Sequence, residues 1–277
     1  MDWSKSKSIF IVVFLFLNIF LYTQYVNVYT QGQEVEILGE KTTEARLKDD
    51  NITYITLPET VENVSYLSGK MRNFEENKLP PNNLVDVQII DDYIVRATFK
   101  EPIELKDSLN VAKFKEFANT YVHDGNKYVL WEIYEDQQYA LYFQTINDRT
   151  LYYNSSGYLK VYWNDLNEIY AYEQTMLEKI EQLEQKDSII PPIQVLQALY
   201  SQRLLKPDSH IIDINLGYST LVQLTQTVFA PTWEVRVQNA DGVIEEHFVN
   251  AFKGKVLEIQ KSSNTVEDED EDEDEEE

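Results

Sequence analysis

The strongest constraint on this chain is a long apolar run near its N-terminus. Residues 9–29 are mostly aliphatic and aromatic, and Asn18 alone interrupts the stronger half. A helix needs roughly 20 mostly apolar residues to cross a bilayer, and this run supplies that length. Lys5 and Lys7 precede the run, while acidic residues dominate after it, which predicts a cytoplasmic N-terminus and an exterior body. We therefore predict a transmembrane helix over residues 9–29 after a cytoplasmic segment, residues 1–8.

A cleaved signal peptide is the alternative interpretation, because it shares the basic start and the apolar run. The residues that follow the stronger half, 23–29, read TQYVNVY and lack the small-x-small pattern of a cleavage site. The chain has no cysteine, which excludes a lipoprotein anchor. We therefore expect a retained single-pass anchor in the cell membrane, with the main body extracytoplasmic.

The composition predicts a folded and acidic exterior part. Of the 277 residues, 43% are apolar and 13% aromatic, which supports packed cores and about two domains. The net charge is −24, and the uninterrupted Glu/Asp run at residues 267–277 supplies eleven of those negative charges. A chain this acidic is a poor partner for nucleic acid. We expect the acidic tail, residues 263–277, to be disordered and solvated.

The hydrophobic periodicity predicts an α+β fold class for the exterior part. We expect two related extracytoplasmic modules after the transmembrane helix, each a helix packed on an antiparallel sheet, joined by a long helix. The predicted order is a stalk (30–50) with a short helix around Glu44 and Lys48, a first α+β module (51–165), a connecting helix (166–188) and a second α+β module (189–262).

In the first module, alternating polar and apolar residues indicate strands. A strand is predicted at 51–57, and two more, at 84–90 and 93–99, flank a hairpin turn at Asp91-Asp92. Asp107 or Ser108 can cap a helix that runs to about Tyr121. Three further strands are predicted at 127–134, 139–146 and 158–163.

Helical spacing of apolar residues defines the connecting helix. They recur by threes and fours at Leu166, Ile169, Tyr172, Met176, Ile180 and Leu183. Pro191-Pro192 starts the helix of the second module, which extends to about Leu205. Strands are then predicted at 210–215, 221–229, 233–238, 243–250 and 255–260, separated by turns at 216–219, 230–231, 239–242 and 252–254.

Few residues suggest catalysis. No pair of the three histidines has the i, i+4 spacing of a helical zinc site. Glu245 and His247 share one face of a predicted strand, but a solvated charged face is the favoured interpretation. Paired carboxylates occur at a turn, Asp91-Asp92, and in the tail, which are poor scaffolds for glycosidase chemistry. We predict no catalytic, cofactor-binding or metal residues, and no enzyme activity.

Asn18 lies near the middle of the predicted span, where an unpaired amide is costly. It can bond to a neighbouring helix, which contributes on the order of 0.6 to 2 kcal/mol, or to its own backbone. Both interpretations stay open at this point. The predicted partner contact is one helical stripe that contains Asn18: Ile11, Phe14, Leu15, Asn18, Leu21, Tyr22 and Tyr25.

A second hypothesis makes the exterior modules a sensor that binds a ligand, such as a peptide or wall fragment, through tyrosine-rich sheet surfaces. Against it, about half of a sheet's aromatic residues pack into a core. A deep aromatic cleft would favour ligand binding and a flat surface would favour protein contact. A third hypothesis, a wall-active hydrolase, needs two carboxylates facing one cleft. The tyrosines in question are Tyr139, Tyr142, Tyr152, Tyr153 and Tyr158.

Several motifs together resemble the YycI family. The N-terminal motif is the distinctive one, and the others extend the resemblance over nearly the whole chain except the acidic tail. The matching segments are MDWSKSK at 1–7, IFI at 9–11, FLFLN at 14–18, LKDDNI at 47–52, LGYS at 216–219, WEVRV at 233–237 and FVNAFKGKV at 248–256.

The resemblance implies a bitopic protein of low-GC Gram-positive bacteria. Such a protein, together with the related YycH, would bind the sensor histidine kinase YycG, also called WalK. That kinase and its response regulator YycF (WalR) control cell-wall metabolism. Contact through transmembrane helices is implied to tune the kinase. Relatives differ in whether the pair restrains or promotes signalling, so the resemblance leaves the direction of control open.

Overall fold

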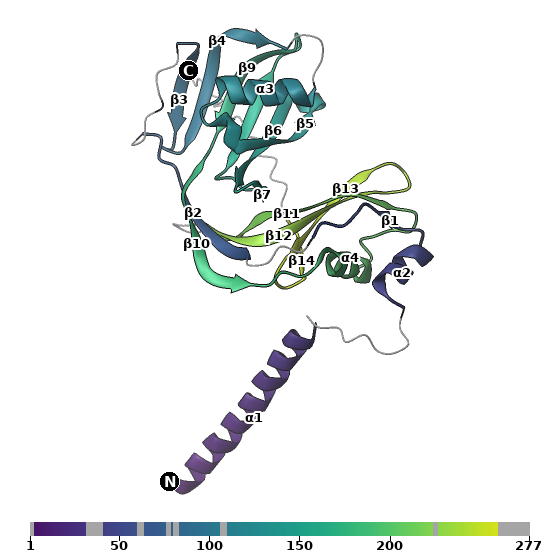
Figure 1. The fold of residues 1–277 in the computed structure, drawn as a ribbon. Helices are drawn as coiled ribbons and strands as arrows, with labels where there is room; N and C mark the ends of the chain where they lie inside the picture. The colour runs from purple at the N-terminus through teal and green to yellow at the C-terminus, as the bar shows by residue number, and fades with distance from the viewer. Residues whose placement is uncertain are drawn as a thin grey trace, which may run out of the picture. The chain divides into compact units, whose positions relative to one another are not determined.

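The computed structural model describes residues 3–31, 41–59, 64–75, 79, 83–105, 110–223 and 227–259. The fold is mixed α+β, dominated by a large sheet with few helices (Figure 1). The chain divides into two compact units, each built from separate stretches of sequence. Unit 1 comprises Met1–Thr60, Ile190–Ile214 and Val235–Val256, and unit 2 comprises Val61–Ile189, Asn215–Glu234 and Leu257–Glu277.

Helix α1 covers Trp3–Gln31 without interruption, so the helix predicted over residues 9–29 is present as a helix. Its described side chains run from Phe10 to Gln24, with Lys7. Within the part of the chain that the structure describes, no helix combines the length and the hydropathy that a membrane crossing requires.

The sheet of unit 2 is an antiparallel array with α3 (Val111–Tyr121) across one face (Figure 1). Phe114 and Phe117 of α3 belong to the same buried cluster as Ala140, Leu159 and other strand residues. In spatial order the strands are β3 (Val85–Ile90), β4 (Ile94–Glu104), β9 (Glu168–Gln174), β8 (Tyr158–Trp163), β6 (Tyr139–Ile146) and β5 (Tyr128–Tyr134).

Local signals explain several of these elements. The hairpin of β3 and β4 turns at Asp91 and Asp92, whose φ angles are 49° and 65°. Two consecutive positive φ angles match the right-handed twist of a hairpin, so this turn prediction is confirmed. Helix α3 begins at Val111, and the side chain of its N-cap, Asn110, accepts a hydrogen bond from Lys113 N at 3.0 Å. The predicted caps, Asp107 and Ser108, lie outside the described residues.

Two further strands of unit 2, β2 (Val64–Met71) and β7 (Arg149–Tyr152), are not predicted from the sequence. Strand β2 pairs antiparallel with β10 (Leu177–Asp187), and β7 forms a hairpin with β6. Buried residues on β2 follow one another instead of alternating, because both of its faces are covered, and a strand of this kind has no period-2 signal.

The predicted connecting helix at 166–188 is wrong. These residues form β9 and β10 instead, joined near Thr175 and Met176. Strand β9 has ladder partners on both sides, with Tyr172 opposite Val161 of β8 and Ala97 of β4. A central strand buries residues on both faces, so its apolar positions can mimic helical spacing. The tyrosines of this segment pack well on a pleated surface, and this packing outweighs the helical pattern.

Two predicted turns are also wrong, because residues 216–219 and 230–231 lie inside β11 (His210–Gln223) and β12 (Thr227–Gln238). A Cβ on Gly217 would lie 2.4 Å from both Thr150 O and Tyr152 Cε2. Gly217 therefore permits the close approach of β7, which pairs with β11 in parallel. Gly217 is therefore required by close packing against a neighbouring strand and does not mark a turn.

Unit 1 contains two helices and short strands. Its elements are α2 (Thr43–Asp49), β1 (Thr53–Tyr54), α4 (Pro192–Ser201), β13 (Ile244–Asn250) and, at its end, β14 (Val256–Leu257), with the ends of β11 and β12. Strand β1 pairs with β11 in parallel, Thr53 opposite His210, so the prediction of an antiparallel sheet is wrong for unit 1. In unit 2 the sheet under α3 is antiparallel as predicted, and β7 with β11 is a parallel pair beside it. The buried apolar residues of this unit include Leu47, Val195, Leu196, Leu199, Leu205, Ile211, Val235, Val237 and Val249.

The predicted stalk at 30–50 is wrong for its second half. Residues 32–40 lie outside the described residues, but α2 is part of unit 1, and its Leu47 is fully buried. Two hydrogen bonds link this region to α4, from Thr43 Oγ1 to Gln197 Oε1 at 3.3 Å and from Tyr200 Oη to Asp50 Oδ2 at 2.8 Å. The short helix predicted around Glu44 and Lys48 is present, as a packed element and not a spacer.

The compact units also differ from the predicted modules. The segment before Thr60 and the segment Ile190–Ile214 share unit 1, whereas the sequence assigns them to different modules, 51–165 and 189–262. The acidic tail, 263–277, lies outside the described residues.

Candidate functional site

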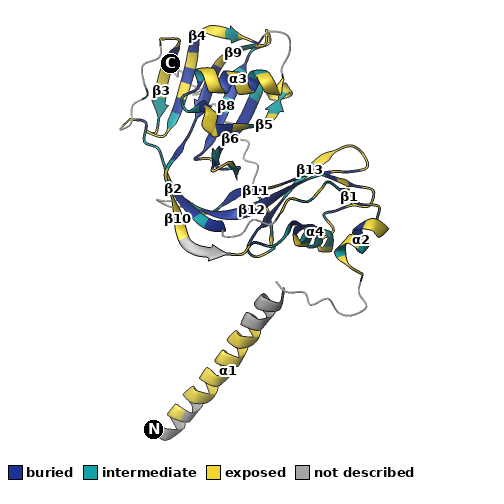
Figure 2. Cartoon of the chain, viewed as in Figure 1, coloured by how far each residue is buried: buried dark blue, intermediate teal, exposed yellow. Residues whose placement is uncertain are grey.

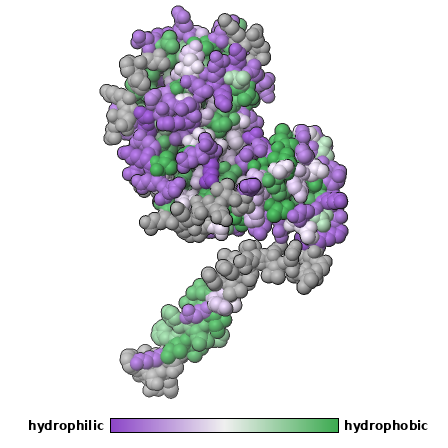
Figure 3. Space-filling view, in the orientation of Figure 1, coloured by the Kyte–Doolittle hydropathy of each residue, from purple (hydrophilic) through white to green (hydrophobic). Residues whose placement is uncertain are grey.

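The predicted partner stripe lies on one face of α1. All seven residues are helical, and their spacing by three, four and seven places them on one side of the helix. Ile11, Phe14 and Tyr22 are 66%, 63% and 68% exposed. The side chain of Tyr25 is outside the described residues. Between residues 10 and 22 the remaining positions of α1 are also apolar and exposed (Figures 2 and 3), so Asn18 is the feature that distinguishes the stripe.

The side chain of Asn18 bonds to its own helix. Its Nδ2 donates to Phe14 O at 2.8 Å. This is one of the two outcomes that the sequence leaves open, and it lowers the cost of the amide in an apolar setting. The carboxamide has two N–H donors and an acceptor oxygen, so this hydrogen bond uses only part of its capacity. Asn18 can therefore hold its own backbone and still offer polar atoms to a second helix.

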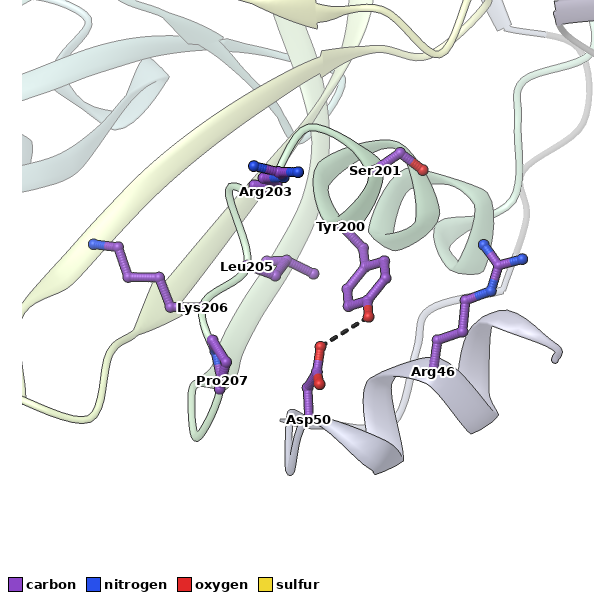
Figure 4. A pocket seen from close by; sticks show the side chains of 8 residues that line it. All are labelled: Arg46, Asp50, Tyr200, Ser201, Arg203, Leu205, Lys206 and Pro207. Atoms are coloured by element: carbon purple, nitrogen blue, oxygen red, sulfur yellow. Dashed lines mark hydrogen bonds between the residues drawn. The ribbon is translucent and has the colours of Figure 1, made fainter.

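A pocket of about 480 Å³ opens in unit 1 where the ends of α2 and α4 meet (Figure 4). Tyr200 points from α4 toward Asp50, and its hydroxyl donates to that carboxylate. This hydrogen bond is the largest cause that raises the pKa of Tyr200. The lining residues are Arg46, Asp50, Tyr200, Ser201, Arg203, Leu205, Lys206 and Pro207.

Asp50 and Lys206, two charged groups of this pocket, are hydrogen-bonded to Tyr200 and Glu245. Lys206 Nζ donates to Glu245 Oε1 at 2.7 Å, and this hydrogen bond lowers the pKa of Glu245. Among the described lining residues Asp50 is the one carboxylate, whereas glycoside hydrolysis needs two. The pocket can accept a polar ligand, but its geometry does not assemble the carboxylate pair that the hydrolase hypothesis requires.

The weak metal candidate lies beside this pocket. Glu245 and His247 share one face of β13, with Glu245 Oε2 at 3.8 Å from His247 Nε2. Glu245 is already bonded to Lys206. No cluster of three potential metal ligands occurs among the residues that the structure describes.

The tyrosine-rich surface of the second hypothesis divides between two faces of the unit 2 sheet. Tyr142 lies on the α3 side, where it is 1% exposed and its hydroxyl donates to Phe114 O at 2.9 Å. Tyr152 is also buried. Side chains alternate along a strand, so Tyr139 lies on the opposite face, which we call the open face. Tyr153 and Tyr158 contact the same small cluster as Tyr139.

A row of four tyrosines crosses the open face, and we call it the aromatic ladder. It comprises Tyr134 of β5, Tyr139 of β6, Tyr162 of β8 and Tyr170 of β9. The consecutive ring centroids lie 4.7, 6.2 and 6.4 Å apart. Tyr170 is 42% exposed, and the other three are partly exposed. Sequence reasoning names only Tyr139 of these four, because the row depends on the register of four strands.

Ionisable side chains lie next to the ladder. The Lys160 ammonium lies over two rings, 5.4 Å from the centroid of Tyr139 and 5.6 Å from that of Tyr158. Burial lowers the pKa of Lys160. Glu173 accepts hydrogen bonds from Tyr158 and from Arg96, the latter at 2.9 Å. Burial of Tyr158 and the hydrogen bond that its hydroxyl donates to Glu173 raise the pKa of Tyr158, so the hydroxyl stays protonated.

A second group of ionisable side chains gathers at the end of α3. The Asp124 carboxylate lies 2.9 Å from Lys127 Nζ and 3.7 Å from both Arg72 Nη1 and His123 Nε2. Burial lowers the pKa of His123; Asp124 opposes this shift, whereas Arg72 and Lys127 add to it. Burial works to raise the pKa of Asp124, but the hydrogen bond from Lys127 and the nearby positive charges lower it overall.

These shifts predict acid sensitivity. In the unfolded chain His123 takes up a proton below about pH 6.5. In the folded chain its pKa is lower, so His123 stays neutral at a pH where the unfolded chain is already protonated at this residue. We therefore expect the free energy of unfolding to fall between about pH 7 and pH 5, and Asp124 to add to the loss as the pH approaches about 4. The His123→Gln chain should lose less over the first interval, as measured by urea unfolding at both pH values. Equal losses in the two chains would contradict this assignment.

Comparison with known proteins gives a match for most of the chain. A family model described as YycI protein matches residues 32–252, and no curated protein matches. Among solved structures, the chain is similar to an uncharacterized protein from Eubacterium rectale, with 12% identity, a TM-score of 0.46, and 76% of this chain and 92% of that chain covered. It is also similar to YycH from Bacillus subtilis, with 14% identity, a TM-score of 0.39, and 69% of this chain and 52% of that chain covered.

Proposed function

The chain belongs to the YycI family, and on this premise we propose that it is a membrane-anchored regulator of the sensor histidine kinase YycG (WalK). It acts together with a YycH-like companion and modulates kinase activity, and thereby signalling that controls cell-wall metabolism. The regulator is not an enzyme. Its N-terminus is cytoplasmic, α1 crosses the membrane once, and both units lie outside the cell.

The observation that carries this proposal is the surface of α1. Large apolar side chains are exposed on every side of the helix, for example Phe10 at 71%, Phe16 at 66% and Leu21 at 55%. A helix that is apolar all round is normally covered, either by a protein core or by lipid. The two lysines before the apolar stretch favour a cytoplasmic start. These features support lipid as the surroundings of α1.

Within the membrane, the stripe around Asn18 supplies the contact with kinase helices. Asn18 bonds to Phe14 O and keeps a further N–H and its oxygen for a partner. A regulator shifts a kinase between two states only by binding one state better than the other. The Asn18 amide is suited to this role. A kinase helix can form a hydrogen bond with it only in the rotation that turns a polar group toward Asn18, so the amide binds one kinase state better than the other.

Exchange of Asn18 for leucine tests this contact. The Asn18→Leu chain keeps an apolar helix but loses the interhelical hydrogen bond, so we expect the affinity for the kinase to fall about threefold to thirtyfold. The measurement is co-purification of kinase with the tagged chain from native membranes, with the response-regulator output as a second readout. Unchanged co-purification and unchanged output would contradict the proposal.

Two phenylalanines provide a matched control. Phe14 and Phe16 are 63% and 66% exposed and lie about 200° apart around the helix. Phe14→Ala should weaken kinase recovery, whereas Phe16→Ala should leave it near the wild-type level. Photo-crosslinking from positions 11, 14, 18, 21 and 25 should capture the kinase, and crosslinking from positions 13, 16 and 20 should not. Equal capture from both faces would exclude the stripe as the contact.

A further inference from the structure

We propose that the open face of the unit 2 sheet binds a neutral glycan strand, which runs along the aromatic ladder of Tyr134, Tyr139, Tyr162 and Tyr170 and stacks a sugar ring on its most exposed member, Tyr170. The proposal assigns a ligand class to an exterior surface. It does not depend on kinase contact through α1.

The geometry of the ladder suits an extended ligand. Its rings come from four neighbouring strands, so they form a row across the sheet with centroid separations of 4.7, 6.2 and 6.4 Å. Cross-strand packing holds neighbouring rings in place before any ligand arrives. A preorganised row loses little side-chain entropy on binding. A glycan repeats a flat, C–H-lined ring along its length. Tyr134 and Tyr139 stack on each other and Lys160 lies over Tyr139, so a sugar ring has its best platform at Tyr170, which is 42% exposed, and the rest of the strand follows the row.

The polar groups along the row match the edges of sugar rings. The Lys160 ammonium lies over the rings of Tyr139 and Tyr158, and Glu173 with Arg96 forms an ion pair on the same face. These groups donate and accept hydrogen bonds beside the rings. Sugar hydroxyls do both, so one hydroxylated ligand can use the ammonium, the guanidinium and the carboxylate together.

The charges around the aromatic ladder favour a neutral ligand over an anionic one. Positive Lys160 and Arg96 are offset by negative Glu173 and by Glu132, which lies close enough to Tyr139 to influence its pKa. The face is therefore balanced, while the whole chain carries −24. Repulsion by the whole chain disfavours anionic polymers, including nucleic acids that could otherwise stack on the rings.

A protein partner fits this surface less well. The cores of protein interfaces are depleted in charged residues, yet here charged side chains alternate with the rings. Covering them with a protein would leave charges to be desolvated and paired. A glycan leaves the sides of the row open to water, so these groups keep part of their hydration.

Titration with neutral oligosaccharides tests the proposal. The full chain in detergent is titrated with chitohexaose and with cellohexaose, followed by calorimetry. We expect binding of at least one of them, with an affinity that falls about fivefold to tenfold in Tyr170→Ala and stays near wild type in Tyr170→Phe. Tyr93→Ala is the matched control, since Tyr93 is 39% exposed in the β3–β4 turn and Tyr170 is 42% exposed.

Three outcomes would overturn the proposal. They are no binding of either oligosaccharide at millimolar concentration, binding that Tyr170→Ala leaves unchanged, and an equal loss in Tyr170→Ala and Tyr93→Ala. Recovery of the kinase with Tyr170→Ala should equal that of the wild type. Failure of glycan binding with normal kinase recovery would reject this inference alone, whereas failure of kinase contact would reject the proposed function alone.

Discussion

The Gly125→Ala chain is expected to lose about 3 kcal/mol of unfolding free energy. A Cβ at position 125 would lie 1.8 Å from Ala118 O, a backbone atom at the end of α3. Because a backbone carbonyl cannot rotate away as a side chain can, the turn between α3 and β5 must shift. Urea unfolding of the full chain, followed by tryptophan fluorescence, to which the buried Trp163 contributes, measures the loss.

Gly242→Ala is the control for this substitution. Gly242 has a φ of 81° and no atom within 4 Å of an added Cβ, so alanine there meets only backbone strain, about 1 kcal/mol. The two glycines separate the effect of close packing from that of backbone conformation. Equal losses in the two chains would contradict the contact at Ala118.

The Phe114→Ala chain is expected to lose about 3 to 5 kcal/mol, the usual range for removal of a buried aromatic ring. Phe114 is fully buried, and its ring centroid lies 5.2 Å from that of Trp163. Truncation leaves a cavity between α3 and the sheet. The same unfolding measurement applies, and the near-ultraviolet signal of Trp163 should also change.

A neighbouring residue of α3 supplies the comparison. Val111 begins the helix and is 63% exposed, so Val111→Ala should change the unfolding free energy by no more than about 0.5 kcal/mol. A similar loss in both chains would mean that α3 does not pack on the sheet through Phe114.

Sequence patterns predict those elements whose signals are local. Asp91-Asp92 marks the β3–β4 hairpin, Pro191-Pro192 marks the start of α4, and the turn residues at 135–136 and 154–157 separate β5, β6 and β8. In each case the residues that define the element lie within a few positions of one another. Caps, turns and one-sided burial are properties of a short segment, so one sequence is enough to find them.

Elements defined by distant neighbours are missed. Residues 166–186 have helical spacing, but β9 is a strand because β8 and β4 supply ladders on both sides. Gly217 looks like a turn residue, yet it faces Tyr152 across a strand pair. The division into units is similarly non-local, since Thr60 and Ile190 lie far apart in sequence and belong to the same unit.

The candidate sites follow the same division. The stripe on α1 depends only on helical spacing, and α1 is a helix over all seven positions. The aromatic ladder depends on strand register. A helical interpretation of 166–186 separates Tyr170 and Glu173 from Tyr162 and Lys160, and only the pairing of β8 with β9 brings them together.

The interleaved order of the two units has a consequence for biosynthesis. Unit 1 gathers three stretches of chain, the last of which ends at Val256, so it cannot be complete until the chain has been synthesised as far as Val256. Unit 2 likewise waits for Asn215–Glu234. Domains normally fold one after another during synthesis, but here neither unit can finish early, so chaperones and proteases would meet two incomplete units at the same time.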